Sequence, residues 1–384
     1  MFEENRYDRY YNLLEELREK MLPFIELQEQ LLEIDETKID EILEYIQENQ
    51  LTSNKTLFNE ILQSINLVVQ ARPLNLQFYI DLLLKLKDDI LINFSSNDLW
   101  HIFRIHKNVL LSLYEEKCID FQTVRKFCYD DKEYLKFFFV EVKENDEKFF
   151  NERIRYLDIE KFFTDINIEE FKKKRKVGHS EWEVARIIRN DSIDEFQNFF
   201  SQSNMNLTEK VPPTIFESDE VVNSKFTPMP TLIEYAAFFN SVNIFKFLWM
   251  NLQSMVTSPN LPKYAICGGC YDLIHICEKE NQVLKFDEEC VSSAIEYHHM
   301  EIVDYLHDSV GIEYTIWLLQ RSIRCFNLDA IFIILEADPK LANASDVYGM
   351  TALHFACERG HLELVKFLLT LKKFNLNFKN WILK

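Results

Sequence analysis

One stretch near the end of the chain constrains its fold most strongly: DVYGMTALHFACERGHLELVKFLL, residues 346–369. Gly349 lies in a turn, where a residue without a Cβ takes positive φ at low cost. Thr351 is a good N-cap for a short helix, which Gly360 ends in the left-handed conformation. The apolar spacing of residues 362–369 predicts a second helix. Two short helices cannot bury their apolar faces alone, so the stretch predicts neighbours of the same kind.

Similar helix–turn–helix units recur upstream at nearly equal spacing. Each has a small residue near the end of its first helix, and these residues are Ala236, Ala265, Ala294, Ser322 and Ala356. The steps between them are 29, 29, 28 and 34 residues. An earlier unit fits at Ile187, with an insertion before Thr231. The spacing therefore predicts an array of stacked helix pairs in the second half of the chain.

The stretch 346–369 resembles an ankyrin repeat, with the pattern D-x-x-G-x-T-P-L-H-x-A-A-x-x-G-H-x-x-x-V-x-x-L-L. Ala352 takes the place of Pro, and Cys357 that of the second Ala. The segments TLIEYAAFF and IIRNDSIDEF resemble the divergent ankyrin-like families of parasitic protists such as trichomonads, in which a helical N-terminal half precedes a degenerate array. This resemblance implies an all-α helical solenoid and no known reaction. The 29-residue steps are shorter than the usual ~33, which predicts shortened hairpins.

The N-terminal half is expected to be helical as well. Residues 1–170 contain short apolar stripes at helical spacing, separated by polar breaks and without a fixed period. Whether this region is also ankyrin-like is left open. The basic segment FKKKRKVGHS marks a change in composition, so we expect a helical region at 1–170, a linker at 171–180 and the array at 181–384.

Charge and composition exclude several classes of protein. The formal net charge is −20, and residues 1–50 alone hold 15 acidic and 5 basic side chains, which opposes binding to nucleic acid or anionic membranes. Charged residues interrupt any early signal peptide, and no apolar run approaches the ~18 residues of a membrane span. The 8 scattered cysteines suit a reducing compartment. We therefore expect a cytoplasmic protein, or a nuclear one if Lys172–Lys176 is an import signal; the alternative for this basic run is a solvated linker or helix end.

The sharpest chemical motif is Cys267-Gly268-Gly269-Cys270. It could be a redox pair, or half of a zinc site with His275 and Cys277. Against this, Gly269 falls where the ankyrin turn needs glycine, and there is no second C-x-x-C pair. We expect a turn there, and a thiol or zinc protein is the alternative. Since the common nucleotide, hydrolase and metalloprotease motifs are missing from the sequence, we expect no enzymatic activity and no cofactor.

Histidines near the turns have expected structural roles. His298 and His299 fall at the turn between two helices and are expected to be turn residues rather than ligands. The resemblance to ankyrin repeats implies a hydrogen bond between His354 and Thr351.

The expected partner is another protein, because solenoids bind through their concave surface and protruding loops. The residues just before each turn are the predicted contacts: Phe238, Phe239, Glu296, Tyr297, Arg324, Glu358 and Arg359. The three aromatic residues would form a patch suited to a protein partner. The alternative is that Phe238 and Phe239 fill the groove between adjacent helix pairs.

The C-terminal end of the array is expected to be incomplete. Residues 375–380 look like the start of another hairpin, but residues 381–383 are too few to supply two helices. The last repeat would then expose apolar surface, unless the tail folds back or a partner or second copy covers it; the chain could also be shorter than its relatives. On this basis residues 346–369 are expected to be the least protected part of the array.

Overall fold

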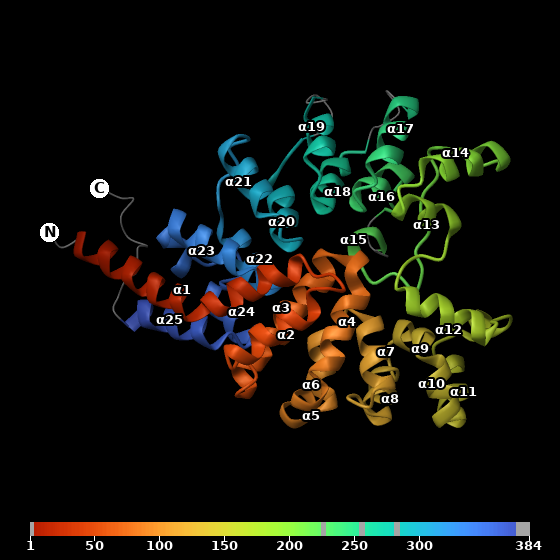
Figure 1. The fold of residues 1–384 in the computed structure, drawn as a ribbon, viewed down its shortest axis with the longest axis horizontal. Helices are drawn as coiled ribbons and strands as arrows, with labels where there is room; N and C mark the ends of the chain where they lie inside the picture. Colours follow the sequence, from red (N-terminus) through yellow and green to blue (C-terminus); the bar gives the residue numbers. More distant parts are fainter. Residues whose placement is uncertain (1–3, 224–227, 253–257, 280–284, 374–384) are drawn as a thin grey trace. The chain divides into compact units, whose positions relative to one another are not determined.

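The computed structural model describes residues 4–223, 228–252, 258–279 and 285–373 (Figure 1). The described residues form helices and two isolated β-bridges, Lys210–Thr231 and Ser345–Thr351, and contain no strand. The all-α prediction is confirmed. Tertiary contacts divide the chain into two compact units. The terminal unit comprises Met1–Arg72 with Ser258–Lys384, and the central unit is Pro73–Thr257.

The terminal unit joins the first three helices of the chain to the C-terminal repeats. Its α-helices are α1 (Glu4–Leu32), α2 (Ile39–Glu48), α3 (Lys55–Ala71), α18 (Leu261–Gly268), α19 (Tyr271–Lys279), α20 (Glu288–Glu296), α21 (Met300–Asp308), α22 (Ile316–Cys325), α23 (Leu328–Ala337), α24 (Ala352–Arg359) and α25 (Leu362–Lys373). A 3-10 helix, η4 (Pro339–Asn343), follows α23.

The central unit contains shorter helices. They are η1 (Pro73–Asn75), α4 (Leu76–Lys85), α5 (Lys87–Asn93), α6 (Ser96–Phe103), α7 (Lys107–Glu115), α8 (Phe121–Phe127), α9 (Lys132–Phe137), α10 (Phe139–Asn145), α11 (Glu147–Tyr156), η2 (Glu160–Phe163), α12 (Ile168–Val177), α13 (Glu183–Arg189), α14 (Ile193–Gln202), α15 (Glu220–Asn223), α16 (Leu232–Phe238) and α17 (Val242–Leu252).

The turn inside each helix pair confirms the predicted repeat register. A residue with positive φ follows each aligned residue by four positions, and these residues are Asp191, Asn240, Gly269, His298, Phe326 and Gly360. Only two of the six are glycine, so four turns place a side chain in the left-handed region, at a cost of roughly 1–2 kcal/mol for His298 and Phe326 and less for Asp191 and Asn240. In the terminal unit the first helices stack in the order α18, α20, α22, α24, and each packs on its own second helix. In the central unit α13 stacks on α16 in the same way.

Helix α1 packs on α3 and also lies against α23 and α25 of the last two repeats (Figure 1). The buried Tyr10 hydroxyl donates to the Leu335 carbonyl at 2.9 Å, and its ring centroid lies 6.1 Å from that of Phe367. The buried Gln28 amide donates to the Phe326 carbonyl at 2.9 Å. The N-terminal segment and the C-terminal repeats therefore share one core.

This arrangement corrects two expectations. Helix α1 packs on α25, in which Leu364 and Leu371 are buried, so weak protection of residues 346–369 is no longer expected. The residues 375–383 on which that expectation drew lie outside the described part of the chain. Residues 171–177 of the predicted linker are helical, in α12, because Asn167 caps the start of the helix, Glu169 and Glu170 suit its first turn, and Gly178 ends it in the left-handed conformation. The domain boundary at 171–180 stays a prediction.

Candidate functional site

Polar side chains that follow the turns connect three of the repeats to the preceding one. Ser241 Oγ donates to the Ile188 carbonyl at 2.6 Å, and Asn327 Nδ2 donates to the Ile295 carbonyl at 2.8 Å. His299 Nε2 lies 3.0 Å from the Cys267 carbonyl oxygen, to which it can donate. These bonds satisfy carbonyl groups at helix C-termini and hold successive turns in a fixed relation. The expectation that His299 is a turn residue is therefore confirmed.

The turn between α24 and α25 is held by a side chain of α3 and not by the preceding repeat alone. His361 Nδ1 lies 3.0 Å from Glu60 Oε2 of α3, and both side chains are buried. The His361 ring also stacks on the Phe326 ring, with centroids 4.2 Å apart. Helix α3 thus takes part in fixing the last repeat, which no local sequence pattern indicates.

The predicted aromatic patch is not at the surface. Phe238, Phe239 and Tyr297 are only 4%, 6% and 1% exposed. Ring contacts surround Phe239, whose centroid lies 4.7 Å from that of Tyr235 and 4.9 Å from that of Phe238. This burial favours the alternative, in which these side chains fill space between helix pairs, because large apolar side chains gain most by leaving water.

The charged residues among the predicted partner contacts lie in different surroundings. Glu296 is half-buried and accepts hydrogen bonds from Gln70 Nε2, at 2.8 Å, and from Arg321. Arg324 is exposed, with its guanidinium 5.4 Å from the Phe355 ring centroid. Glu358 is exposed and Arg359 is half-buried. Arg324 and Glu358 are therefore the predicted contacts that solvent reaches most readily.

Three exposed apolar side chains on two adjacent repeats were not predicted. Val347 is 92% exposed, Tyr348 is 87% exposed and Trp317 is 40% exposed. Val347 and Tyr348 form the tip of the turn before α24, and Trp317 lies in the first turn of the adjacent α22. We call these three residues the hairpin edge. Val347 and Tyr348 could have been found from the sequence, since two apolar residues at the tip of a predicted turn have no core to enter.

The turn that carries Val347 and Tyr348 is fixed by hydrogen bonds. Asp346 Oδ1 accepts from the backbone N–H groups of Tyr348, at 2.9 Å, and Met350, at 2.8 Å. Gln320 of α22 donates to the Met350 carbonyl at 2.9 Å, which ties the turn to the neighbouring repeat. At the start of α24, Thr351 Oγ1 lies 2.9 Å from His354 Nδ1, so the bond implied by the resemblance is confirmed.

The Cys267–Cys270 segment is a helix end followed by a turn. Cys267 is buried in α18, and Gly269 has φ of +71°. A Cβ on Gly269 would lie 2.3 Å from the His299 ring, so the turn needs glycine for space as well as for conformation. Burial raises the pKa of Cys277 to about 12, which keeps this thiol protonated. Within the described ranges, no group of three His, Cys, Asp or Glu side chains could hold a metal ion.

The basic run Lys172–Lys176 is engaged in α12. Arg175 is 1% exposed and forms a two-pronged bond with Glu141, both N–O distances being 2.7 Å. Lys174 Nζ lies 2.8 Å from Glu170 Oε1 on the same helix. The centre of the run thus has a structural role, and its action as an import signal stays a prediction.

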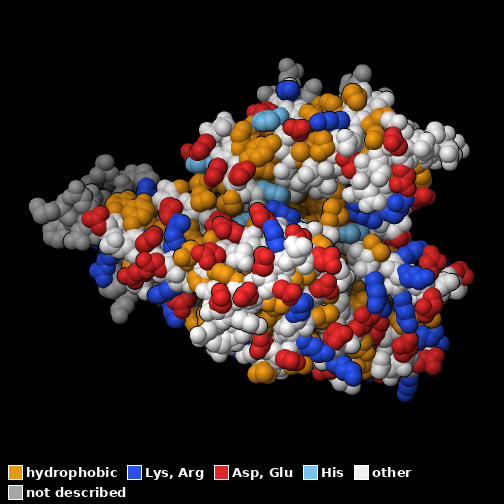
Figure 2. Space-filling view, in the orientation of Figure 1, with side chains coloured by type: hydrophobic (Ala, Val, Ile, Leu, Met, Phe, Trp, Pro, Cys, Tyr) orange, Lys and Arg blue, Asp and Glu red, His pale blue; other side chains and the backbone are white. Residues whose placement is uncertain are grey.

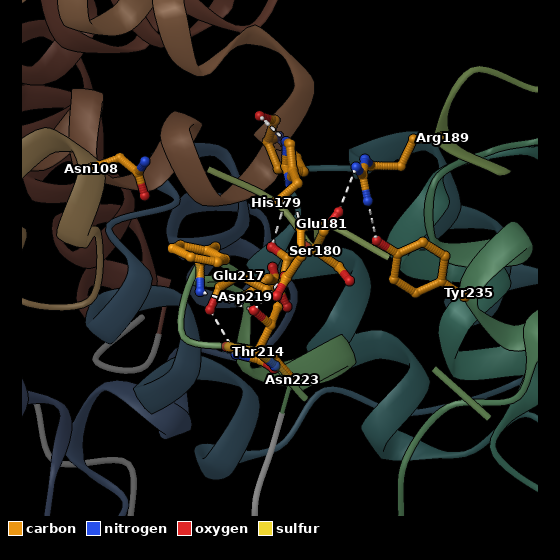
Figure 3. Close-up of polar contacts among 12 residues, drawn as sticks. Asn108, His179, Ser180, Glu181, Arg189, Thr214, Glu217, Asp219, Asn223 and Tyr235 are labelled. Carbon is orange, nitrogen blue, oxygen red and sulfur yellow. Dashed lines mark hydrogen bonds and ion pairs between the residues drawn. The ribbon is translucent and has the colours of Figure 1, made fainter. Parts of the chain in front are cut away.

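A buried polar cluster in the central unit holds the predicted insertion before Thr231 (Figure 3). His179 Nδ1 lies 3.3 Å from Glu217 Oε2 of the insertion, and both side chains are buried. Arg189 donates to the Tyr235 hydroxyl at 2.7 Å and to the Ser180 carbonyl at 2.8 Å. Burial, aided by the charge of Glu217, raises the pKa of Tyr235, so its phenol stays protonated. The cluster joins the insertion to α13 and α16.

Comparisons with known proteins support the repeat assignment. Residues 252–334 match the family described as "Domain of unknown function (DUF3447)". Residues 334–380 match the family described as "Ankyrin repeats (many copies)". No curated protein matches the chain. The fold is an all-α array of helix pairs, and its residues 334–380 are similar to ankyrin repeats, which are modules for protein–protein interaction. The finer resemblance to protist families stays a prediction.

Neither family description names an enzymatic activity. Over the ranges that the structure describes, no helix combines the length and apolar character needed to cross a bilayer.

Proposed function

We propose that the protein is a non-enzymatic scaffold or adaptor that binds a protein partner through the hairpin edge of its C-terminal repeats. The observation that carries this proposal is the exposure of Val347 and Tyr348, at 92% and 87%, on a turn with fixed geometry. Aromatic side chains dominate the binding energy of protein interfaces, and exposed apolar groups mark such surfaces.

The order of the turn supports the proposal. The bonds from Asp346 and Gln320 hold the backbone before any partner arrives. A preformed surface loses little conformational entropy on binding, so more of the contact energy remains as affinity. Arg324 and Glu358, further along α22 and α24, would add polar contacts beside the apolar ones.

The cellular location is proposed on independent grounds. Cys128, Cys277 and Cys290 are free and buried in the fold. Free thiols persist in reducing compartments, which supports a cytoplasmic or nuclear location.

The test compares proteins captured by the full chain and by two variants. The edge variant is Val347→Ser with Tyr348→Ser. The control is Leu91→Ser with Ile92→Ser, an adjacent exposed apolar pair of the central unit, 49% and 80% exposed. We expect a specific set of proteins to be lost with the edge variant and kept with the control. Identical capture by all three chains would contradict the proposal.

A further inference from the structure

The central unit contains a groove with a volume of about 1820 Å³. Three segments line most of it: residues 126–136 around α8 and α9, residues 157–174 around η2 and α12, and residues 213–223 of the insertion. Sites for small molecules usually measure roughly 300–1,000 Å³. The volume therefore fits a longer occupant, such as a peptide segment.

The insertion forms one wall of this groove, and hydrogen bonds from the Asn223 side chain fix the conformation of the insertion (Figure 3). Asn223 Nδ2 donates to the carbonyls of Thr214, at 2.8 Å, and Glu217, at 2.6 Å. The Asn223 Oδ1 atom accepts from the Thr214 N–H at 2.9 Å. Three bonds from one side chain thus fix the loop from 214 to 217.

The same wall is attached to the helices beside it. The Phe216 ring lies 5.3 Å from the Phe171 ring of α12, centroid to centroid. Lys107 of α7 donates to the Ile215 carbonyl, and Thr214 Oγ1 donates to Glu181 at 2.7 Å. Together with the His179–Glu217 contact, these contacts fix the position of this wall of the groove.

The lining combines aromatic rings with an excess of negative charge. Nine acidic and six basic side chains line the groove, and Figure 2 shows the two kinds intermixed over α8–α12. Lys136 is paired with Glu133 and Lys174 with Glu170, so these charges cancel, and Asp130 lies 3.5 Å from Arg153. Asp165 and Glu220 of the lining are exposed. The rings of Phe127, Tyr134, Phe162, Phe171 and Phe216 also line the groove. Such a surface favours cations, through carboxylates and aromatic faces, together with apolar groups.

We propose that this groove binds an extended peptide segment in which Lys or Arg residues alternate with apolar ones. The carboxylates meet the cationic side chains, and the aromatic rings meet the apolar ones. The acidic excess disfavours nucleic acid and acidic peptides. The groove lies in the central unit and is independent of the hairpin edge, so it provides a second binding site.

The test measures fluorescence anisotropy of the full chain with two labelled 12-residue probes, four repeats of Lys-Leu-Ser and four repeats of Glu-Leu-Ser. The groove variant is Asp165→Lys with Glu220→Lys, two exposed residues of the lining. The control is Glu41→Lys with Glu44→Lys, two exposed residues of α2, which changes the net charge equally. A milder variant, Asp165→Asn with Glu220→Gln, removes the charges at nearly constant size.

We expect the Lys-Leu-Ser probe to bind and the Glu-Leu-Ser probe not to bind. The groove variant should weaken binding about tenfold or more, the neutral variant less, and the control less than about twofold. Equal losses in groove and control variants would show general attraction to an acidic protein and would overturn the proposal. So would equal binding of both probes, or no binding of the basic one. The edge variant Val347→Ser with Tyr348→Ser should keep full affinity for the probe, so the two proposals fail separately.

Discussion

His361 Nδ1 lies 3.0 Å from Glu60 Oε2, although 301 positions separate the two residues. The contact joins α3 to the turn of the last repeat, where both side chains are buried. It shows how the beginning of the chain stabilises its end.

The first prediction concerns this pair. Glu60→Ala should lower the free energy of unfolding by roughly 2–4 kcal/mol, because it leaves a buried polar partner unsatisfied. Denaturant titration would measure the change, with Glu44→Ala on exposed α2 surface as the control, expected to stay within about 0.5 kcal/mol. In a double-mutant cycle with His361→Ala the effects should not add. Simple additivity would mean that the two side chains do not interact.

The second prediction concerns the cover that α1 gives to α25. Leu17→Ala removes a buried contact of α1 and should cost roughly 2–5 kcal/mol. Hydrogen exchange should then become faster in α25, where α1 packs, and change less in α20. Leu22→Ala, at a 47% exposed position of the same helix, is the matched control and should leave α25 protected. Equal protection of α25 in all three chains would contradict the role of α1.

The third prediction uses the strained turns. Asn240→Gly should stabilise the protein by about 0.5–1 kcal/mol, because the exposed Asn240 has φ of +54°, which glycine adopts at lower cost. Asn251→Gly, in helix α17, should have the opposite sign, since glycine weakens helices. Thermal unfolding of both variants would check the signs, and destabilisation by Asn240→Gly would refute the assigned conformation.

The fourth prediction is a loss of stability in mild acid. Burial, aided by the charge of Arg72, lowers the pKa of His298 to about 4 and that of His299 to about 3. In the unfolded chain both should titrate near 6.5, so the unfolded state binds more protons between these values and stability falls as the pH falls below about 6.5. From pH 7 to pH 5 the loss should be about 2 kcal/mol per histidine.

Chemical denaturation at the two pH values would measure this loss. His298→Asn keeps a residue that tolerates the left-handed turn and removes the titrating group, so its loss should be smaller by about half. The facing carboxylate of Asp329 lies 3.9 Å from His298 Nε2 and is present in both chains. An equal loss in wild type and variant would assign the acid sensitivity to other groups.

The sequence predicted the repeats well because their turns depend on local chemistry. Small residues such as Ala265 and Ala294 precede each turn at a fixed distance, and this spacing survives even where His298 or Phe326 replaces glycine. The position of α1 could not be predicted in this way, because its contacts with Leu335 and Phe326 involve residues about 300 positions away.

The candidate site was harder to predict for a related reason. The register placed Phe238 and Tyr297 correctly before their turns, but it could not show which side of a short helix faces the core. The wall of the groove likewise depends on the contact of Phe216 with Phe171, which joins the insertion to a helix 45 positions earlier.

The most direct measurement of the central claim is site-specific photocrosslinking from the hairpin edge. A photoreactive phenylalanine analogue would replace Tyr348, which is 87% exposed, or, as the control, Tyr156, which is 74% exposed in the central unit. In extract of the cells that make the protein, we predict that the analogue at position 348 crosslinks to one discrete protein. The Trp317→Ser substitution should lower the yield of this crosslink, and the analogue at position 156 should not give it. The same crosslinks from both positions, or none from position 348, would contradict binding through the hairpin edge.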